Sequence, residues 1–255
     1  MSVTRDIFNE RRDEISAYFQ FMTEIIDYKA ALIFPLPLGS PDETIRIEKT
    51  VSLELSHTLK ANGFLLLYNL VEATMCNAID EIHDTIGNLT TLGADDLNET
   101  LSKTAIRSFR NGAMQITNHC ANPISQSILL YWLGHHQKSV KDNQNPLFSG
   151  NVDARKIREV AEKYGFSHNT NSANTQDGRR LLLVKTKRND LAHGHSAFKE
   201  CGRDIPLSDL MEIKAEVLYY LDEILTNIES YMNNKKFLRT TPTAVATVTS
   251  IVASI

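Results

Sequence analysis

Apolar residues recur at every third or fourth position along most of this chain, with polar residues between them, as is typical of amphipathic helices. Residues 4–33 carry such a stripe, and residues 57–87 are apolar almost all round before they turn amphipathic. The first stretch predicts an amphipathic helix and the second a buried central helix. Prolines between residues 35 and 41 separate the two. Residues 44–55 partly alternate polar and apolar side chains, which is compatible with a short strand, a hairpin or an early helical turn.

The remaining apolar stripes predict five further helices, over residues 96–108, 124–139, 152–165, 179–193 and 207–234. Short polar side chains that can cap a first turn mark two of the starts. These are Asp95 or Asp96 for the first of the five helices, and Asn151 or Asp153 for the third. Gly194 directly follows the fourth helix, at the position where a left-handed residue commonly ends a helix.

The predicted fold class is therefore all-α, with at most a minor short β element near residues 44–55. We expect a single helical domain over residues 1–238, with its core between residues 57 and 235. Residues 239–255 are expected to form a C-terminal tail, uncharged from Thr240 onward, that is either disordered or a peripheral element. The main bundle is predicted from the helices at residues 57–87, 124–139, 179–193 and 207–234.

The composition is that of a water-soluble globular protein, with 255 residues, 42% hydrophobic and 23% charged side chains, and a net charge of −4. A negative chain offers no overall attraction to nucleic acid, so any nucleic-acid site has to be a local patch. Three separated cysteines without a C-x-x-C pair argue against a disulfide framework and fit a reducing cytoplasm. The charged start is unlike a signal peptide, and the apolar run Gly63–Val71 is too short to span a membrane, so no membrane partner is expected.

The most distinctive chemistry lies in RNDLAHGH, residues 188–195. The spacing from arginine to histidine is weak on its own, because about one such pair is expected by chance in a chain of this composition. Residues 179–199, however, hold six basic side chains and one acidic one, a local charge of +5. Such a patch suits phosphate, and Lys185 and Lys187 are candidate RNA-binding side chains, although charge runs are more often solvated faces.

Arg188 and His193 are the candidate catalytic pair. Five residues advance about 140° beyond a full helical turn, so the two side chains do not share one stripe. A two-fold axis that pairs two copies of this helix can place two arginines and two histidines around one cleft. Histidine can act there as general acid or base on RNA and arginine can stabilise the phosphate, with no metal and no cofactor. Asn189, one turn before His193, is expected to hydrogen-bond the histidine ring.

His193 and His195 also form a His-x-His pair, a pattern that occurs in metal sites. Such pairs usually lie on strands, and no carboxylate or cysteine nearby in the sequence offers a third ligand. We therefore expect no metal, and a supporting role for His195 beside the catalytic pair.

Glu72 falls on the apolar side of the predicted central helix, where an unpaired carboxylate is very costly. Arg188, Lys185 or Lys187 of the neighbouring helix is expected to supply its partner. A structural ion pair and a supporting catalytic role are both compatible with this position, and both hold if Glu72 orients Arg188.

The stretch KTKRNDLAHG resembles the Arg-(Asn)-x-x-x-His signature of HEPN domains, the helical "higher eukaryotes and prokaryotes nucleotide-binding" superfamily. Three longer blocks are similar to recurring blocks of one bacterial branch, the stand-alone HEPN-like nucleases. They read KANGFLLLYNLVEATM, PLFSGNVDARKIREVAEKYGF and RNDLAHGHSAFKECGRDIPLSDL, and together they lie within residues 60–235.

This resemblance implies a helical bundle that forms a homodimer with its signature helices face to face. It implies a metal-independent endoribonuclease that leaves a 2′,3′-cyclic phosphate and a 5′-hydroxyl, with Arg188 and His193 as catalytic residues and Asn189 at the polar position after the arginine. Such proteins are associated with toxin–antitoxin and anti-phage defence systems, so an antitoxin or defence-system partner is expected. Some members carry a tyrosine two residues after the histidine, where this chain has His195, so control by modification of that tyrosine is not available here.

Two alternatives stay open at this point. The chain can be a non-catalytic HEPN module that binds nucleotide or RNA, or that serves as a scaffold for another protein. It can also be a metal-dependent hydrolase that uses His193 and His195 as ligands.

Overall fold

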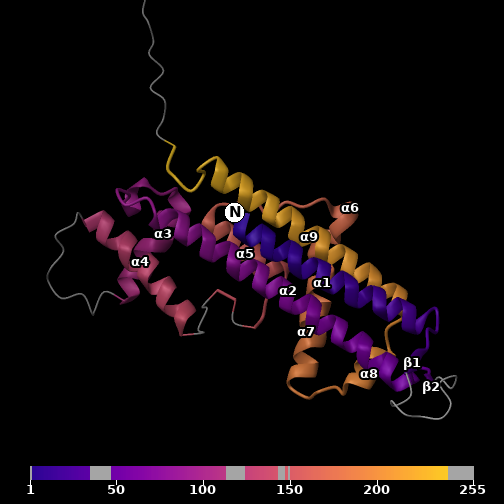
Figure 1. Cartoon of the computed structure of the whole chain (residues 1–255). Coiled ribbons are helices and arrows are strands. Elements are labelled where there is room, and N and C mark those ends of the chain that lie inside the picture. Colours follow the sequence, from indigo (N-terminus) through magenta and orange to yellow (C-terminus); the bar gives the residue numbers. More distant parts are fainter. Residues whose placement is uncertain (1, 35–46, 113–123, 143–146, 149, 241–255) are drawn as a thin grey trace, which may run out of the picture.

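The computed structural model describes residues 2–34, 47–112, 124–142, 147–148 and 150–240, and within them the chain is almost entirely helical (Figure 1). The predicted all-α class is confirmed. The proline-containing stretch 35–41, Cys120 and the tail from residue 241 lie outside the described residues. The helices are α1 (Ser2–Ile26), α2 (Leu53–Gly87), α3 (Glu99–Gly112), α4 (Ile124–Lys141), α5 (Ala154–Tyr164), α6 (Ser172–Thr175), α7 (Arg179–Ala192), α8 (Phe198–Arg203) and α9 (Leu207–Asn233), with short 3-10 turns η1 (Ala94–Asp96) and η3 (Gln176–Gly178).

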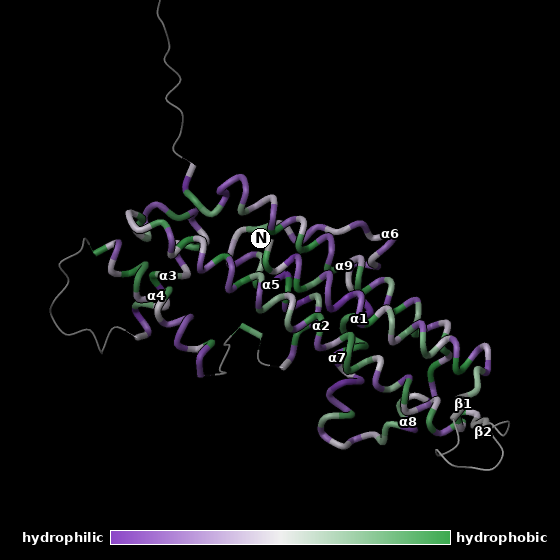
Figure 2. The backbone as a smooth tube through the Cα atoms, viewed as in Figure 1, coloured by the Kyte–Doolittle hydropathy of each residue, from purple (hydrophilic) through white to green (hydrophobic). Residues whose placement is uncertain are grey.

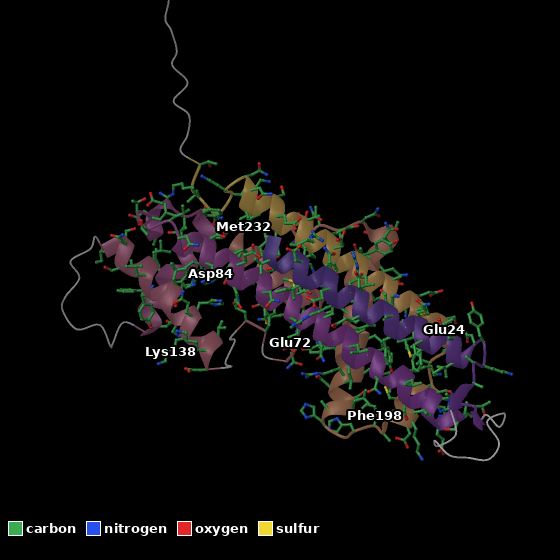
Figure 3. All side chains as sticks on the ribbon, viewed as in Figure 1. Glu24, Glu72, Asp84, Lys138, Phe198 and Met232 are labelled. Carbon is green, nitrogen blue, oxygen red and sulfur yellow. The ribbon has the colours of Figure 1, made fainter. Side chains whose placement is uncertain are left out.

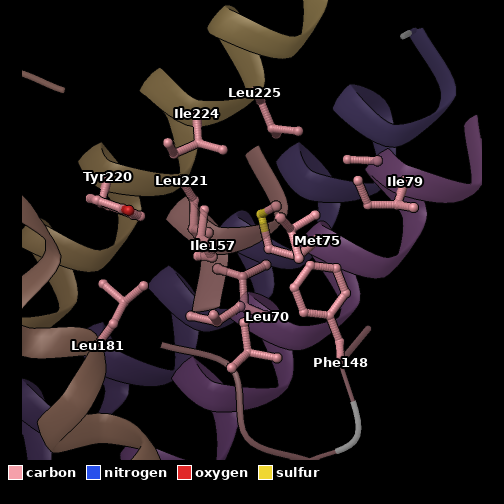
Figure 4. Close-up of a cluster of buried hydrophobic side chains, with 14 of the residues drawn as sticks. Leu70, Met75, Ile79, Phe148, Ile157, Leu181, Tyr220, Leu221, Ile224 and Leu225 are labelled. Carbon is pink, nitrogen blue, oxygen red and sulfur yellow. The ribbon is translucent and has the colours of Figure 1, made fainter. Parts of the chain in front are cut away.

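Helix α2 is the centre of the fold, as its all-round apolar sequence predicts. It packs against α1, α7, α8 and α9, and many of its side chains are completely buried, among them Phe64, Leu67 and Met75. On α1 and α9, apolar and polar residues alternate more regularly than on α2, as the changing colours along their turns show (Figure 2). Figure 4 shows part of the core, where Met75 and Phe148 meet side chains of α5 and α9. Burying each such side chain contributes about 1.5–3 kcal/mol.

The membership of the main bundle differs from the prediction. Helix α4 lies beside α3 and η1 near the C-terminal end of α2, whereas α1 runs along α2 and also contacts α9 (Figure 1). The reason is the continuous stripe of Phe8, Ile15 and Met22 on α1, which is fully buried against these helices. A guanidinium contact across the interface strengthens the packing, because Arg5 Nε donates to Glu229 Oε1 of α9 at 2.8 Å.

Helix α1 also ends earlier than the predicted boundary at residue 33. It stops at Ile26, and Lys29 then takes a left-handed backbone conformation (φ 53°), which a continuing helix cannot contain. Strand β1 (Leu32–Phe34) follows and pairs antiparallel with β2 (Ile47–Lys49), so the strand alternative for residues 44–55 is confirmed for three of them. Helix α2 then starts at Leu53, where the Ser52 side chain accepts a hydrogen bond from the N–H of Leu55.

The helix caps were predicted with mixed success. Helix α3 starts at Glu99 and is capped by Asn98, whose Oδ1 accepts the N–H of Leu101 at 3.0 Å, so the prediction of Asp95 or Asp96 was wrong. Those two residues instead form the 3-10 turn η1. Helix α5 is capped by Asp153, one of the two predicted candidates. Among the described helices, none is long and apolar enough to cross a membrane.

Candidate active site

The Arg188 side chain reaches from α7 toward α2. Its guanidinium carbon lies 4.4 Å from the centre of the Tyr68 ring, a cation–π distance, and its Nη2 lies 4.0 Å from Glu72 Oε2. The arginine and glutamate side chains are only 25% and 24% exposed, so this pair is partly shielded from water. The expectation that a basic residue of the neighbouring helix meets Glu72 is therefore confirmed, with Arg188 as that residue.

A short loop between α4 and α5 completes the surroundings of this arginine. Arg188 Nη1 donates to the carbonyl of Gly150 at 3.3 Å, and the N–H of Gly150 donates to Glu72 Oε1 at 2.9 Å. The N–H of Val152 donates to the Tyr68 hydroxyl at 3.2 Å. Figure 3 shows Glu72 where α2 passes this loop. The guanidinium is thus held by α2 on one side and by residues 150–152 on the other.

Asn189 does not make the hydrogen bond predicted for it. Its Oδ1 accepts from Arg188 Nη1 at 2.9 Å and its Nδ2 donates to Asn151 Oδ1 at 3.1 Å. The prediction of a bond to the His193 ring was wrong because the charged guanidinium and the loop are stronger partners for the amide. Asn189 reaches His193 only through the backbone, where its carbonyl accepts the N–H of His193 at 2.9 Å. Asn189 therefore positions the arginine and not the histidine.

His193 occupies the opposite environment from Arg188. It is the C-terminal cap of α7, followed by Gly194 in a left-handed conformation (φ 71°), and its side chain is exposed. No hydrogen bond to its ring from another described side chain was found, so the imidazole is available to a ligand. Its ring centre lies 5.8 Å from that of His195, which is 70% exposed and has Nδ1 3.9 Å from Asp190 Oδ1. The described residues gather no three potential metal ligands in one place.

The two lysines that were predicted to bind phosphate lie in different environments. Lys185 is bound to the carboxylate of Asp153 at the start of α5, and the two side chains are 17% and 7% exposed. Lys187 is half-buried on the side of α7 that faces Cys201 of α8, and no acidic partner for it is found in the described part of the chain. Of the two, only Lys187 keeps a charge without an acidic partner.

The basic patch of residues 179–199 is accordingly weaker than its sequence indicates. Acidic residues from elsewhere in the chain neutralise three of its six cations: Glu216 faces Arg180, Asp153 binds Lys185, and Glu72 faces Arg188. A count within one stretch of sequence cannot include these partners, since they come from α2, α5 and α9. The contacts of Arg188 with Tyr68 and with residues 150–152 were not predicted either, because these residues also lie far from Arg188 in the sequence. The only signal for the loop was its place in the block PLFSGNVDA.

Replacing Asp153 by asparagine is expected to lower the free energy of unfolding by about 2 kcal/mol at pH 7, because asparagine keeps the helix cap but leaves Lys185 without its carboxylate. Burial raises the pKa of Asp153, but the hydrogen bonds from Lys185 and from the N–H of Lys156 outweigh it and leave this pKa below its ordinary value. The stabilisation is therefore complete above the ordinary pKa of an unfolded aspartate and disappears as the pH falls through the lower, folded pKa.

Urea unfolding of both proteins at pH 7 and again below pH 4 measures this difference. The difference in the free energy of unfolding between wild type and Asp153→Asn should be smaller at the lower pH. A gap that is independent of pH would show that the ion pair is not its source.

A comparison with known proteins places this chain in a family. The model of the HEPN_MAE_28990-like HEPN family matches residues 3–237, a range that starts within α1, runs past the end of α9 and contains all the site residues named above. Comparisons with curated proteins and with solved structures found no match. HEPN domains form a superfamily that includes ribonucleases. The match covers nearly the whole chain, and the chain belongs to the HEPN_MAE_28990-like HEPN family.

Proposed function

We propose that this protein is a metal-independent endoribonuclease whose active site is shared by two copies of the chain. The observation that carries the proposal is the contrast on one helix, α7. Arg188 is held in a fixed place by Glu72, Asn189 and the 150–152 loop, while the His193 imidazole at the helix end is exposed. A positioned cation and an available imidazole are the two kinds of group that can carry out metal-free cleavage of RNA.

The chemistry follows from these groups. One imidazole removes the proton of a ribose 2′-hydroxyl, and the 2′-oxygen attacks the adjacent phosphorus. The bond from phosphorus to the 5′-oxygen breaks, and a protonated imidazole gives that oxygen its proton. The products are a 2′,3′-cyclic phosphate and a 5′-hydroxyl. Arg188 would stabilise the extra negative charge that the phosphate oxygens carry in the transition state.

One chain alone supplies only part of this arrangement. It offers one proposed catalytic histidine, His193, for two proton transfers, and that histidine is open to water, where charge stabilisation is weak. A second chain related by a two-fold axis would add a second His193 and cover the first.

The remaining site residues then have supporting roles. Glu72 and Asn189 would hold the guanidinium in place, and His195 would offer a hydrogen bond to the phosphate. Lys187 would contact the RNA backbone, whereas Lys185 serves the packing of α5 on α7 through Asp153. We further propose that the enzyme is a toxin or an anti-phage effector that an antitoxin or defence-system partner controls. The alternative is a non-catalytic HEPN module that binds RNA or nucleotide.

The purified protein should cleave total RNA or tRNA in excess EDTA and leave 2′,3′-cyclic phosphate and 5′-hydroxyl ends, because the groups named above require no divalent ion. The products are identified by whether polynucleotide kinase can label the 5′ ends directly. A matched oligonucleotide with a single 2′-deoxyribose at the cut position is the control and should stay intact. Activity that EDTA abolishes and a divalent ion restores would contradict the proposal, and RNA binding without cleavage would favour the non-catalytic module.

A further inference from the structure

A second feature with the character of a binding site lies between α3, α4 and α5. It is a pocket of about 270 Å³. Helices α3 and α4 lie near the C-terminal end of α2, whereas α7 and α8 pack toward its other end, so the pocket is remote from His193 (Figure 1). The proposed ribonuclease activity uses none of its residues.

The charged side chains that line the pocket are all cationic. Arg107 comes from α3 and Lys163 from α5, and His135 of α4 also lines the pocket. No acidic partner of Arg107 is found among the residues that the structure describes. Lys163 Nζ lies 2.6 Å from Glu159 Oε1, but both side chains are nearly half exposed, and such surface pairs contribute little and exchange readily. The Arg107 and Lys163 side chains can therefore both contact a ligand.

The pocket wall is apolar and firmly built. Trp132 and Tyr164 form part of it and are 5% and 2% exposed, respectively. The Tyr164 hydroxyl is hydrogen-bonded to His83 Nε2 at 2.7 Å, and the His83 ring stacks on His136 with 3.7 Å between ring centres. Asp80 Oδ1 lies 2.7 Å from His136 Nε2 and holds that ring in turn. The wall is thus fixed in shape before any ligand arrives, which favours binding.

We propose that this pocket binds a small phosphate monoester with a flat apolar body. The phosphate would lie between Arg107 and Lys163, since a guanidinium and an ammonium together match its charge and its oxygen acceptors. The apolar body would lie against Trp132 and Leu147. The volume lies just below the usual range for ligand pockets, which favours a compact molecule over a polymer.

The chain provides its own reporter for a test, because Trp132 is the only tryptophan among the 255 residues. Phenyl phosphate is the probe. Phenol and inorganic phosphate are compared with it, because each carries only one of its two parts, the apolar ring or the phosphate. Phenyl phosphate should change the fluorescence of Trp132 in a saturable way, and each half should bind more weakly. Arg107→Ala should raise the dissociation constant of phenyl phosphate about tenfold, as expected for the loss of one charge-assisted contact.

Arg155→Ala is the matched control, because Arg155 is exposed at the far end of α5 and does not line the pocket. It should leave the dissociation constant unchanged. The proposal is overturned if phenyl phosphate gives no saturable change at millimolar concentration, if phenol binds as well as phenyl phosphate, or if the two arginine substitutions have the same effect. The measurement needs no RNA, so its outcome is independent of the proposed ribonuclease activity.

Discussion

Replacing His193 by alanine should lower the rate of RNA cleavage by about a thousandfold, in the middle of the range for a general acid–base residue. In a two-fold site the substitution removes the His193 imidazole of both copies at once, so both proposed proton transfers lose their carrier. The fold should be unaffected because the side chain is exposed at the end of α7. The test compares cleavage rates of the two proteins in EDTA, with circular dichroism and the thermal midpoint as checks on the fold.

His195→Ala is the matched control for this prediction. The two histidines are two positions apart, both exposed, and have ring centres 5.8 Å from each other. Loss of His195 should reduce cleavage by less than about tenfold, as expected for a side chain that contacts the phosphate but does not transfer the protons. Equal losses in the two variants, or full activity of His193→Ala, would contradict the assignment.

A test of Arg188 requires a substitution that disturbs its neighbours less than alanine does. Its removal would leave Glu72 without a cation and the Gly150 carbonyl without a donor, so a loss of activity could reflect a disturbed loop. Lysine keeps the charge but cannot form the planar fork of hydrogen bonds. Arg188→Lys should therefore keep the fold and still lose most of the activity.

Replacing Gly202 by alanine should lower the free energy of unfolding by about 3 kcal/mol or more, the upper range for overpacking a core. Gly202 lies where α8 crosses α2, and a Cβ atom there would be 1.8 Å from the carbonyl oxygen of His57. That oxygen is backbone and cannot rotate away. Helix α8 would have to move off α2, and the segment that joins it to His193 would move with it, so cleavage should fall as well.

Gly134→Ala is the control, since Gly134 lies inside α4 with no atom within 4 Å of the added Cβ. Alanine there should be neutral or stabilise the helix by up to about 1 kcal/mol. Urea unfolding of the two variants and the wild type gives all three free energies. Similar stabilities of Gly202→Ala and Gly134→Ala would show that α8 is not held closely against α2.

Much of the fold follows from local patterns. Apolar periodicity predicts the helices because each one buries a stripe that its own sequence displays, and Asp153 and Gly194 mark helix ends because capping is a local interaction. The position of α1 in the bundle could not be predicted from such local patterns. Its stripe shows that it packs on something, but the choice of α2 and α9 as its neighbours depends on which other surfaces are left uncovered.

Some contacts of the candidate site residues could be predicted from the sequence and others could not. The Arg188–Glu72 pair could be anticipated, because a carboxylate on an apolar face needs a cation. The capture of Lys185 by Asp153 and of Asn189 by Arg188 could not, since these depend on how a loop far away in the sequence lies against α7. A net charge counted along one stretch of sequence leaves out the acidic partners that the fold brings in from other elements.

The central position of α2 also determines the order in which the protein can assemble during its synthesis. Helix α2 ends at residue 87, whereas three of the helices that cover it begin only at residue 179 or later. A chain leaving the ribosome therefore exposes most of this apolar helix until its last third has emerged, which makes shortened chains prone to aggregate. Arg188 cannot meet Glu72 before that stage. Translation products that end before α7 would thus lack the candidate site. The proposed activity would then come only from chains whose synthesis has passed this point.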